Sequence, residues 1–356
     1  MGIEFCYWAP LEKNGLLATT LPQRTGSSFA DNVRYAAIAE RCGFGSVLLP
    51  TRFIASSDGE DQWESLTIAS ALATQTKSLR LIAAVASGLW PPAIVAKILT
   101  TIDHLSGGRA AVNVVSGWLK DEYVALGEPW LDHDERYRRS EEFIRVLRAL
   151  WTEEQANFAG DFYRLRKAEF RPRPLQQPGP PVYQGGNSKA ARRMAGRVSD
   201  FYLMNGNTVE NLRKQIEEVR KYAAENGREV RFGVNAFVIV RDTEAEARQQ
   251  LRDIIDYADA ATVEAFRRQV LHAGKAAPER KGMWADSTFE DLIQFNDGFK
   301  TGLIGTAEQV AERITELQEI GMDLLLAGFL HYDDELERFG QEVIPLVRQR
   351  EKAYSF

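Results

Sequence analysis

Short apolar segments alternate with amphipathic segments along nearly the whole chain, and this alternation limits the folds that are open to it. Each apolar segment has the length of a buried strand, and the amphipathic segments carry apolar residues at helical spacing. Strands that alternate with helices form right-handed βαβ units, and such units build a parallel sheet. The strand candidates are residues 3–9, 45–50, 79–86, 109–115, 182–184, 201–204, 232–240 and 322–327.

Eight such strands in one run predict a closed (β/α)₈ barrel, the α/β TIM barrel. An open, doubly wound sheet is the alternative, and it favours a G-x-G-x-x-G motif after the first strand. Residues 9–17 (APLEKNGLL) follow that strand and lack the motif. We therefore expect one barrel domain over residues 1–356, with insertions at about 116–133, 153–180 and 258–303.

Composition and charge exclude several classes of protein. With 44% hydrophobic and 26% charged residues, the chain has a globular composition rather than that of a disordered or coiled-coil protein. Its net charge of −6 provides no broad field to attract nucleic acid or anionic lipid. Two cysteines, Cys6 and Cys42, are too few for a disulfide scaffold or a Cys-rich zinc site. The start of the chain lacks a signal-peptide pattern and no apolar run reaches the ~20 residues of a membrane helix, which predicts a soluble, cytoplasmic protein.

Function in a barrel belongs to the loops at the carboxyl ends of the strands, and one such loop is Gly185-Gly186-Asn187-Ser188. It follows a short strand and opens a helix. Backbone N–H groups, a Ser hydroxyl and the positive end of a helix suit a phosphate. An ordinary glycine turn with an N-capping residue is the plainer alternative. The position after a late barrel strand favours the phosphate.

Two other segments carry candidate binding residues. Asn113 interrupts an apolar strand, and a buried carboxamide needs partners, either within the protein or on a ring such as a pyrimidine or a flavin. Residues 132–137 (DHDERY) open a helix, where the acidic residues can act as caps. Alternatively, His133, Arg136 and Tyr137 reach a phosphorylated ligand from this helix end.

No metal site is predicted, because the four histidines are far apart and form no H-x-x-x-H or H-E-x-x-H pattern. His331 closes the last strand, where a group that titrates near neutral pH suits acid–base chemistry. Loop aromatic residues, Trp8 and Phe329 among them, either pack the core or exclude water from a reactive intermediate. The polar insert at 258–301, with glycines at 274, 282 and 298, is the candidate lid.

Taken together, the motifs of this chain resemble those of the bacterial-luciferase-like, flavin-dependent monooxygenases. The resemblance covers nearly the whole chain and includes three segments that are similar to the dimethylsulfone monooxygenases within that family. Alkanesulfonate and pyrimidine monooxygenases are similar relatives. The family motifs are residues 101–118 (TIDHLSGGRAAVNVVSGW), 131–143 (LDHDERYRRSEEF), 181–192 (PVYQGGNSKAAR) and 303–314 (LIGTAEQVAERI), and the three narrower segments are 233–243 (GVNAFVIVRDT), 296–306 (NDGFKTGLIGT) and 324–340 (LLLAGFLHYDDELERFG).

This resemblance implies a TIM barrel that takes FMNH₂ from a separate NAD(P)H-dependent FMN reductase and uses O₂ to cleave a C–S bond. For dimethylsulfone, the implied products are methanesulfinate and formaldehyde. Relatives of this kind also imply a homo-oligomer, either a dimer or a tetramer. A sulfonate-cleaving enzyme, an oxidoreductase dependent on the deazaflavin coenzyme F420 and a non-catalytic flavin-binding protein are the alternatives.

The resemblance also implies roles for particular residues. Asn113 would contact the isoalloxazine, and Ser116 and Glu122 would line the loop beside it. The expected catalytic residues follow from their positions in the sequence instead: His331 is the best-placed titratable group, and Arg52 is the expected substrate clamp. The ribityl phosphate would be held by His133, Arg136, Tyr137, Gly186 and Ser188, and the substrate pocket would contain Trp8, Phe237 and Phe329.

Two motifs depart from those of the sulfonate enzymes. Their Arg-x-His on the seventh strand reads Asn235-Ala236-Phe237 here, and their Tyr-x-His after the last strand reads Phe329-Leu330-His331. Fewer cationic groups fit a neutral substrate better than a sulfonate anion. In contrast, residues 48–52 (LLPTR) are similar to the LIPT segment of the sulfonate enzymes, and Arg52 can pair with a sulfonate.

Overall fold

The first and last strands of the barrel lie side by side, although more than three hundred residues separate them in the sequence. In the computed structural model, β1 (Glu4–Trp8) pairs in parallel with β12 (Leu324–Gly328), and Glu4 lies opposite Leu324. This pairing closes the sheet, so the predicted TIM barrel is confirmed and the open sheet is excluded. The structure describes residues 2–12, 16–54, 62–279 and 282–354, with the backbone alone for 271–276.

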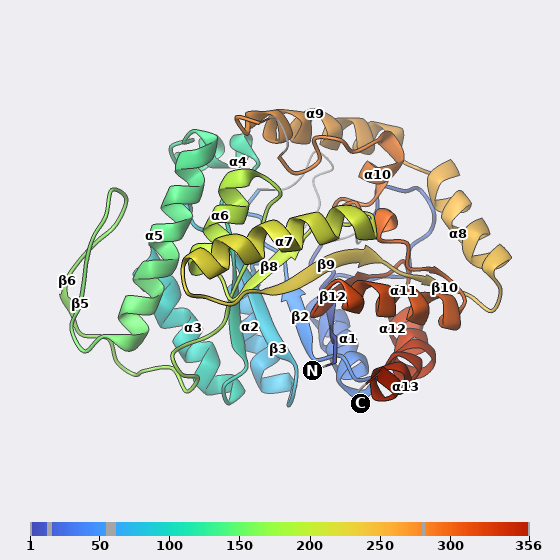
Figure 1. Ribbon diagram of the computed structural model, residues 1–356, viewed down its shortest axis with the longest axis horizontal. Coiled ribbons are helices and arrows are strands. Elements are labelled where there is room, and N and C mark those ends of the chain that lie inside the picture. Colours follow the sequence, from blue (N-terminus) through green and yellow to red (C-terminus); the bar gives the residue numbers. More distant parts are fainter. Residues whose placement is uncertain (1, 13–15, 55–61, 280–281, 355–356) are drawn as a thin grey trace.

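All eight barrel strands lie where the sequence pattern predicts them, and neighbours in the barrel are parallel. Helices on the outside connect consecutive strands (Figure 1). The remaining barrel strands are β2 (Ser46–Leu49), β3 (Arg80–Ala86), β4 (Ala110–Val115), β7 (Val182–Gly185), β8 (Phe201–Met204) and β9 (Arg231–Phe237). The surrounding helices are α1 (Phe29–Arg41), α2 (Ser65–Gln75), α3 (Pro92–Ser106), α5 (His133–Thr152), α6 (Lys189–Val198), α7 (Val209–Glu225), α11 (Ala307–Glu319), α12 (Tyr332–Arg338) and α13 (Ile344–Tyr354), the last two joined by a π-helical turn, η2 (Phe339–Val343).

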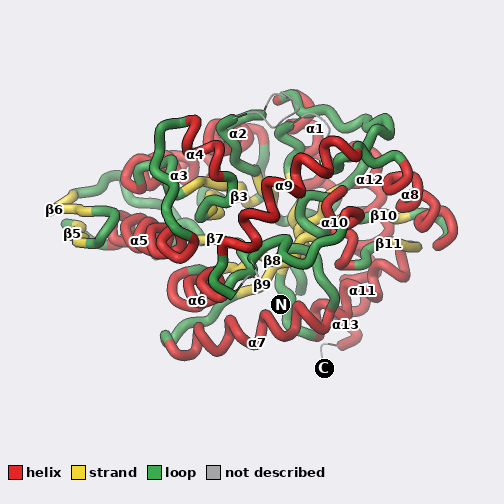
Figure 2. Tube along the Cα trace, turned by 90° about the horizontal axis from the view of Figure 1, so that it is seen from above, coloured by secondary structure: helices red, strands yellow, loops and turns green. Residues whose placement is uncertain are grey.

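Three segments extend the basic barrel. Two of them lie within the expected insertions at 116–133 and 153–180, whereas the third begins about twenty residues before its expected start at 258, because the chain leaves the barrel sheet after residue 237. The first contains α4 (Lys120–Ala125), and the second contains a hairpin of β5 (Ala156–Ala159) and β6 (Arg164–Ala168) that projects from the side of the barrel (Figure 1). The third follows β9 and crosses over the carboxyl ends of the strands, as Figure 2 shows for α9. Its elements are β10 (Ile239–Val240), α8 (Glu244–Asp256), α9 (Ala260–Ala276), α10 (Phe289–Ile293), a 3₁₀ turn η1 (Gly298–Thr301) and β11 (Ile304–Gly305).

The third insertion is fixed to the barrel by side-chain and backbone hydrogen bonds. The amide oxygen of Gln294 accepts hydrogen bonds from the side chain of Asn235 on β9 (3.2 Å) and from the backbone of Gly298 (2.6 Å). On the opposite side, the loop after β1 joins both ends of the insert, since Ala18 N–H donates to Ile293 O and Ala18 O accepts from Asp259 N–H. The insert therefore forms a roof over this end of the barrel.

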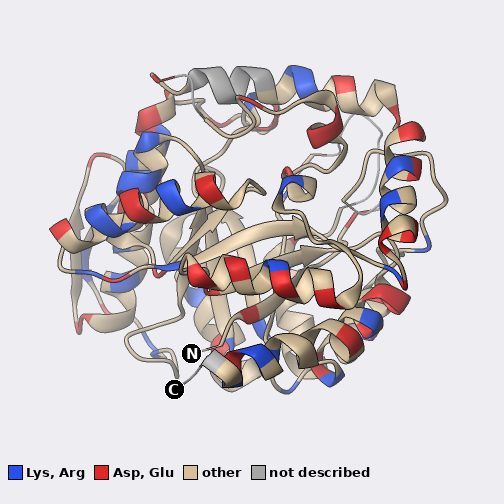
Figure 3. Cartoon of the chain, turned by 45° about the vertical axis from the view of Figure 1, so that its right-hand side comes forward, with Lys and Arg blue, Asp and Glu red and all other residues tan. Residues whose placement is uncertain are grey.

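The outer helices start at strong capping residues and carry mixed charges. Capping boxes begin α1 at Ser28 and α11 at Thr306, where each hydroxyl accepts from the third helical N–H. Figure 3 shows acidic and basic residues interspersed along the outer helices of the face in view. Within the described residues, none of the helices combines the length and the apolar character required to cross a bilayer.

The side chain of Arg109 connects the carboxyl ends of α2 and α3 with the residue that precedes β3. The guanidinium of Arg109, just before β4, donates to the backbone oxygens of Ala73, Thr76, Leu79 and Ser106 and to the Thr76 hydroxyl, over distances of 2.7–3.0 Å. The last carbonyl groups of a helix have no partner within the helix, so these bonds satisfy the carboxyl ends of α2 and α3. Burial lowers the pKa of this guanidinium, which nonetheless stays charged because arginine titrates far above neutral pH.

We expect Arg109→Ala to lower the free energy of unfolding by about 3 kcal/mol or more, because several half-buried carbonyl oxygens lose a charged donor at once. Chemical denaturation monitored by circular dichroism measures this loss. Arg166→Ala removes an exposed arginine from the β5–β6 hairpin and is the matched control, with an expected change below about 0.5 kcal/mol. Equal stabilities of the two variants would contradict this role for Arg109.

Candidate active site

A cavity of about 570 Å³ opens at the carboxyl end of the barrel, beneath the third insertion. Every barrel strand contributes an inward-facing residue to its floor, because alternate residues of a strand point to the same face. These residues are Trp8, Leu48, Ala84, Asn113, Gly185, Leu203, Asn235 and Leu326. The cavity is therefore the upper part of the barrel interior.

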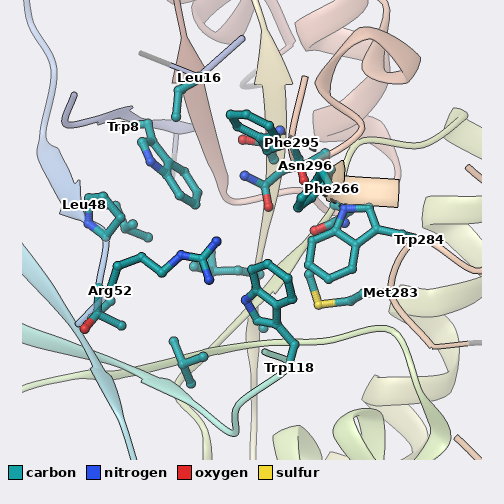
Figure 4. Close-up of a pocket in the computed structure, with 18 of the residues that line it drawn as sticks. Trp8, Leu16, Leu48, Arg52, Trp118, Phe266, Met283, Trp284, Phe295 and Asn296 are labelled. Atoms are coloured by element: carbon teal, nitrogen blue, oxygen red, sulfur yellow. Dashed lines mark hydrogen bonds between the residues drawn. The ribbon is translucent and has the colours of Figure 1, made fainter. Parts of the chain in front are cut away.

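The two sides of the cavity differ in chemistry. One side is polar and is formed by Asn113, Ser116, Tyr137 and Gly186 from β4, α5 and the loop after β7. The other side is aromatic and carries a single arginine, Arg52, which Figure 4 shows extending toward Trp118. The other aromatic and apolar residues of this side are Trp8, Leu16, Phe266, Met283, Trp284 and Phe295.

The polar side contains a cradle for an anionic group where α6 begins. Gly186 adopts a φ of +130°, a region that side chains disfavour, and a Cβ there would approach the Tyr137 hydroxyl oxygen to 2.7 Å. The Ser188 side chain accepts a hydrogen bond from Ala191 N–H at 3.2 Å and caps the helix. Burial raises the pKa of Tyr137, and a hydrogen bond with Ser188 opposes this rise. The close approach of a neutral hydroxyl, a capping serine and a bare backbone suits a phosphate at the positive end of a helix.

Two buried carboxamides on the cavity floor point to a ligand with donor groups. The side-chain oxygens of Asn113 on β4 and Asn235 on β9 are shielded from solvent and accept no hydrogen bond from the part of the chain that the structure describes. Asn235 is held in this orientation because its amide nitrogen donates to Gln294 Oε1 and to Asn296 O. A reduced isoalloxazine carries N–H groups and a polar edge, so both the floor and the phosphate cradle fit FMNH₂.

Comparison with known proteins agrees with this geometry. The model of the family described as luciferase-like monooxygenase matches residues 4–324. The chain belongs to the luciferase-like monooxygenase family. It is 54% identical over 350 residues to an FMNH₂-dependent dimethylsulfone monooxygenase from Pseudomonas putida, a match that covers 98% of this chain and 96% of the relative.

Solved structures show the same luciferase-like barrel at low sequence identity. An EDTA monooxygenase from Chelativorans sp. BNC1 superposes with a TM-score of 0.83 at 21% identity, over 98% of this chain and 94% of that one. An F420-dependent secondary alcohol dehydrogenase superposes with a TM-score of 0.73 at 21% identity, over 98% and 100% of the two chains. These likenesses establish the fold alone, because enzymes with different cofactors share it.

Arg52 is held in this site by the ring of Trp118, on which it stacks, and by the carboxylate of Glu122, which fixes the segment that follows Arg52. The Arg52 guanidinium lies 4.5 Å from the centre of the Trp118 ring, and its Nη1 atom is buried without a hydrogen-bond partner among the described residues. Burial lowers the pKa of Arg52, and the charges of Glu122 and Glu12 oppose this effect. Glu122 is itself buried and accepts from Phe53 N–H at 2.7 Å, so it fixes the segment that follows Arg52.

Several residues predicted to bind the cofactor lie just behind the polar side. A chain of hydroxyl groups links Ser116 on the cavity surface to Ser140 and then Ser87, with 2.8 Å between successive oxygens. Arg136 stacks on Trp130 and donates to Gly117 O (3.1 Å), so it supports the loop after β4. His133 packs its ring on Tyr137, with 5.1 Å between the ring centroids, while its Nδ1 lies 2.6 Å from the Asp134 carboxylate.

Four of the residues predicted to bind the cofactor lie behind the cavity surface and do not line it. They are Glu122, His133, Arg136 and Ser188. Their direct contact with the cofactor therefore stays a prediction. The structure gives them supporting positions for the residues in front: Glu122 holds the loop of Arg52, and His133 and Ser188 hold Tyr137.

Three other predicted residues do not reach the cavity. Phe329 faces outward, because it alternates with the inward-facing Leu326 and Gly328 positions of β12, and it packs against Phe44 and Phe339. Phe237 faces inward but is fully buried beneath Phe299 of η1, 5.3 Å away.

His331 begins α12, and its Nδ1 accepts from Arg24 N–H at 3.3 Å outside the cavity lining. Burial lowers its pKa, which keeps the ring neutral at neutral pH.

The third insertion contributes side chains to the cavity that the sequence motifs do not indicate. Residues 258–301 were expected to cover the site, but no individual side chain among them was identified. The signal was available in the aromatic residues of an otherwise polar segment. The insertion residues that line the cavity are Asp259, Thr262, Phe266, Gln269, Met283, Trp284, Phe295 and Asn296.

Gly186→Ala should weaken the binding of oxidised FMN at least tenfold, because the added methyl group meets the Tyr137 hydroxyl and the Ala191 Cβ within 3 Å. Quenching of flavin fluorescence measures the dissociation constant. Gly127→Ala is the matched control, since Gly127 also has a positive φ (+78°) but has nothing within 4 Å of the added carbon. Unchanged FMN affinity in Gly186→Ala would contradict the cradle.

Proposed function

We propose that this protein is the oxygenase component of a two-component system that oxidises dimethylsulfone to methanesulfinate and formaldehyde. The observation that supports this proposal most strongly is the 54% identity to the dimethylsulfone monooxygenase of Pseudomonas putida across nearly both chains. An FMNH₂-dependent enzyme of this kind implies a flavin reductase as partner, and the proposal takes this reductase to be NAD(P)H-dependent.

The reaction balances with one molecule each of sulfone, O₂ and FMNH₂. One oxygen atom becomes the carbonyl oxygen of formaldehyde and the other leaves as water, while the C–S bond breaks and its electron pair stays on sulfur. FMNH₂, bound at the polar side of the cavity, supplies the two electrons that O₂ requires. The protein binds and orients the substrate and keeps water away from the reacting groups.

The charge of the cavity favours an uncharged substrate. Arg52 is the only cation among the described residues that line the cavity, whereas Glu12 and Asp259 bring two carboxylates to the same lining. An anionic sulfonate therefore meets no net positive field. A sulfone is neutral but has two strongly accepting oxygens, and the buried Nη1 of Arg52 is a donor that suits one of them.

The aromatic side accounts for the rest of the proposed binding. The methyl groups of a small sulfone pack against the indoles of Trp8 and Trp118, and Trp284 closes the same side from above. Trp284 is held there by a hydrogen bond from its Nε1 to Phe295 O (2.8 Å) and by ring contacts with Trp118 and Phe266. These contacts place the roof of the cavity between the substrate and bulk water.

His331 receives no chemical step in this proposal, because the structure places it outside the cavity lining. The proposal does include a cytoplasmic location, where NAD(P)H is available, and a homo-oligomer. Sedimentation analysis measures the oligomeric state.

With FMN, NADH, a flavin reductase and O₂, we expect the purified protein to release formaldehyde from dimethylsulfone and none above background from methanesulfonate. Derivatisation of formaldehyde measures both reactions in parallel. Formaldehyde from methanesulfonate alone would instead favour a sulfonate monooxygenase with Arg52 as its anion contact. If neither compound reacts and the protein binds F420 in preference to FMNH₂ under anaerobic conditions, the hydride-transfer alternative holds.

Arg52→Gln should lower kcat/KM for dimethylsulfone about 10- to 100-fold, because a buried charged hydrogen bond to the substrate contributes roughly 1.5–3 kcal/mol. The dissociation constant of FMN should stay within about twofold of the wild-type value. Arg145→Gln, an exposed change on α5, controls for loss of one positive charge. An unchanged kcat/KM in Arg52→Gln would remove this residue from substrate binding.

A further inference from the structure

A carboxylate from the third insertion lies at the amino end of α6. Glu279, just after α9, accepts a hydrogen bond through Oε1 from the backbone N–H of Lys189, at 2.6 Å. Lys189 is the first residue of α6, so its N–H is one of those that the helix itself leaves without a partner. The amino end of a helix attracts anions, and here the protein supplies the anion from ninety residues further along the chain.

Glu279 lies next to the proposed phosphate cradle. Lys189 directly follows the Gly186–Ser188 turn that forms this cradle. The Tyr137 hydroxyl lies over Gly186, and the charge of Glu279 contributes to the raised pKa of Tyr137, although burial is the larger cause. The carboxylate is therefore close enough to act on the groups that would hold a phosphate.

Two anions at this helix end repel each other, so the free energy of binding both is less favourable than that of binding either one alone. A phosphate carries about −1.5 to −2 charges near neutral pH, so it is repelled by a carboxylate at the same N–H groups. Each anion also needs the same limited set of backbone donors. Binding of one consequently weakens binding of the other.

We propose that Glu279 occupies the anion position of α6 in the flavin-free protein and leaves it when the FMN phosphate binds. This inference rests on the proposed function, since it takes the cradle to be the phosphate site of FMN. Glu279 thereby lowers the affinity for the flavin, and it does so through the phosphate and not through the ring. Such a residue suits an oxygenase that receives FMNH₂ from another protein and must afterwards release FMN.

The test compares FMN with riboflavin, which has the same ring and ribityl chain but no phosphate. Flavin fluorescence at equilibrium gives the dissociation constant of each oxidised flavin for the wild-type protein, Glu279→Gln and Glu279→Ala. We expect FMN to bind about three- to tenfold more tightly to both variants, in line with the stabilisation of charges at helix ends. Riboflavin should bind within twofold of the wild-type value.

Glu290→Gln is the matched control, because it removes one exposed carboxylate from the same insertion and leaves α6 untouched. It should change neither dissociation constant by more than twofold. If Glu279→Gln tightens FMN and riboflavin equally, the residue acts on the insertion and not on the phosphate, and the inference is wrong. An unchanged ratio of the two affinities overturns it as well. If the wild-type protein binds neither oxidised flavin, the comparison is made anaerobically with FMNH₂ and reduced riboflavin, and a protein that binds neither reduced flavin overturns the proposed function itself.

Discussion

The pairing of β1 with β12 is the contact on which the rest of the structure depends. These strands are brought together from opposite ends of the chain, and their parallel hydrogen bonds close the sheet into a barrel. Closure fixes the direction of every strand, so all eight carboxyl ends meet at one rim. The cavity floor then follows from alternation alone, because the inward-facing residue near the end of each strand has only the barrel interior to face.

Closure also explains why the site has two chemically different sides. Strands β4 and β7 are neighbours in the barrel although a long insertion separates them in sequence, so Asn113 and the glycines after β7 lie together. On the far side, β1 and β2 bring Trp8 and Arg52 beside the aromatic residues of the third insertion. The polar side therefore suits a cofactor with a phosphate and a polar ring, and the aromatic side suits a small substrate.

The barrel could be predicted from the sequence because its signal is periodic, whereas much of the site could not. The strand that holds Asn113 and the turn at Gly186 are visible as a polar break and a glycine pair within regular elements. The position of Phe329 directly after β12 predicts a place in the pocket, but the alternation of side chains continues past the end of the strand and turns Phe329 outward onto Phe44 and Phe339. In the insertion, Val263, Phe266 and Val270 follow helical spacing on α9. This pattern does not tell where the face of α9 packs, and Phe266 and Trp284 reach the cavity through tertiary contacts.

The unpartnered polar atoms of the cavity connect stability with binding. The buried oxygens of Asn113 and Asn235 and the Nη1 of Arg52 each forgo a hydrogen bond in the ligand-free protein, at a cost of roughly 1–3 kcal/mol apiece. A barrel with a large core and an extensive ladder of backbone bonds tolerates this cost. Ligands that offer N–H groups to the asparagines and an acceptor to the arginine recover it on binding, and ligands without these groups do not. In the proposed function, these atoms therefore select for a reduced flavin and for an oxygen-bearing neutral substrate.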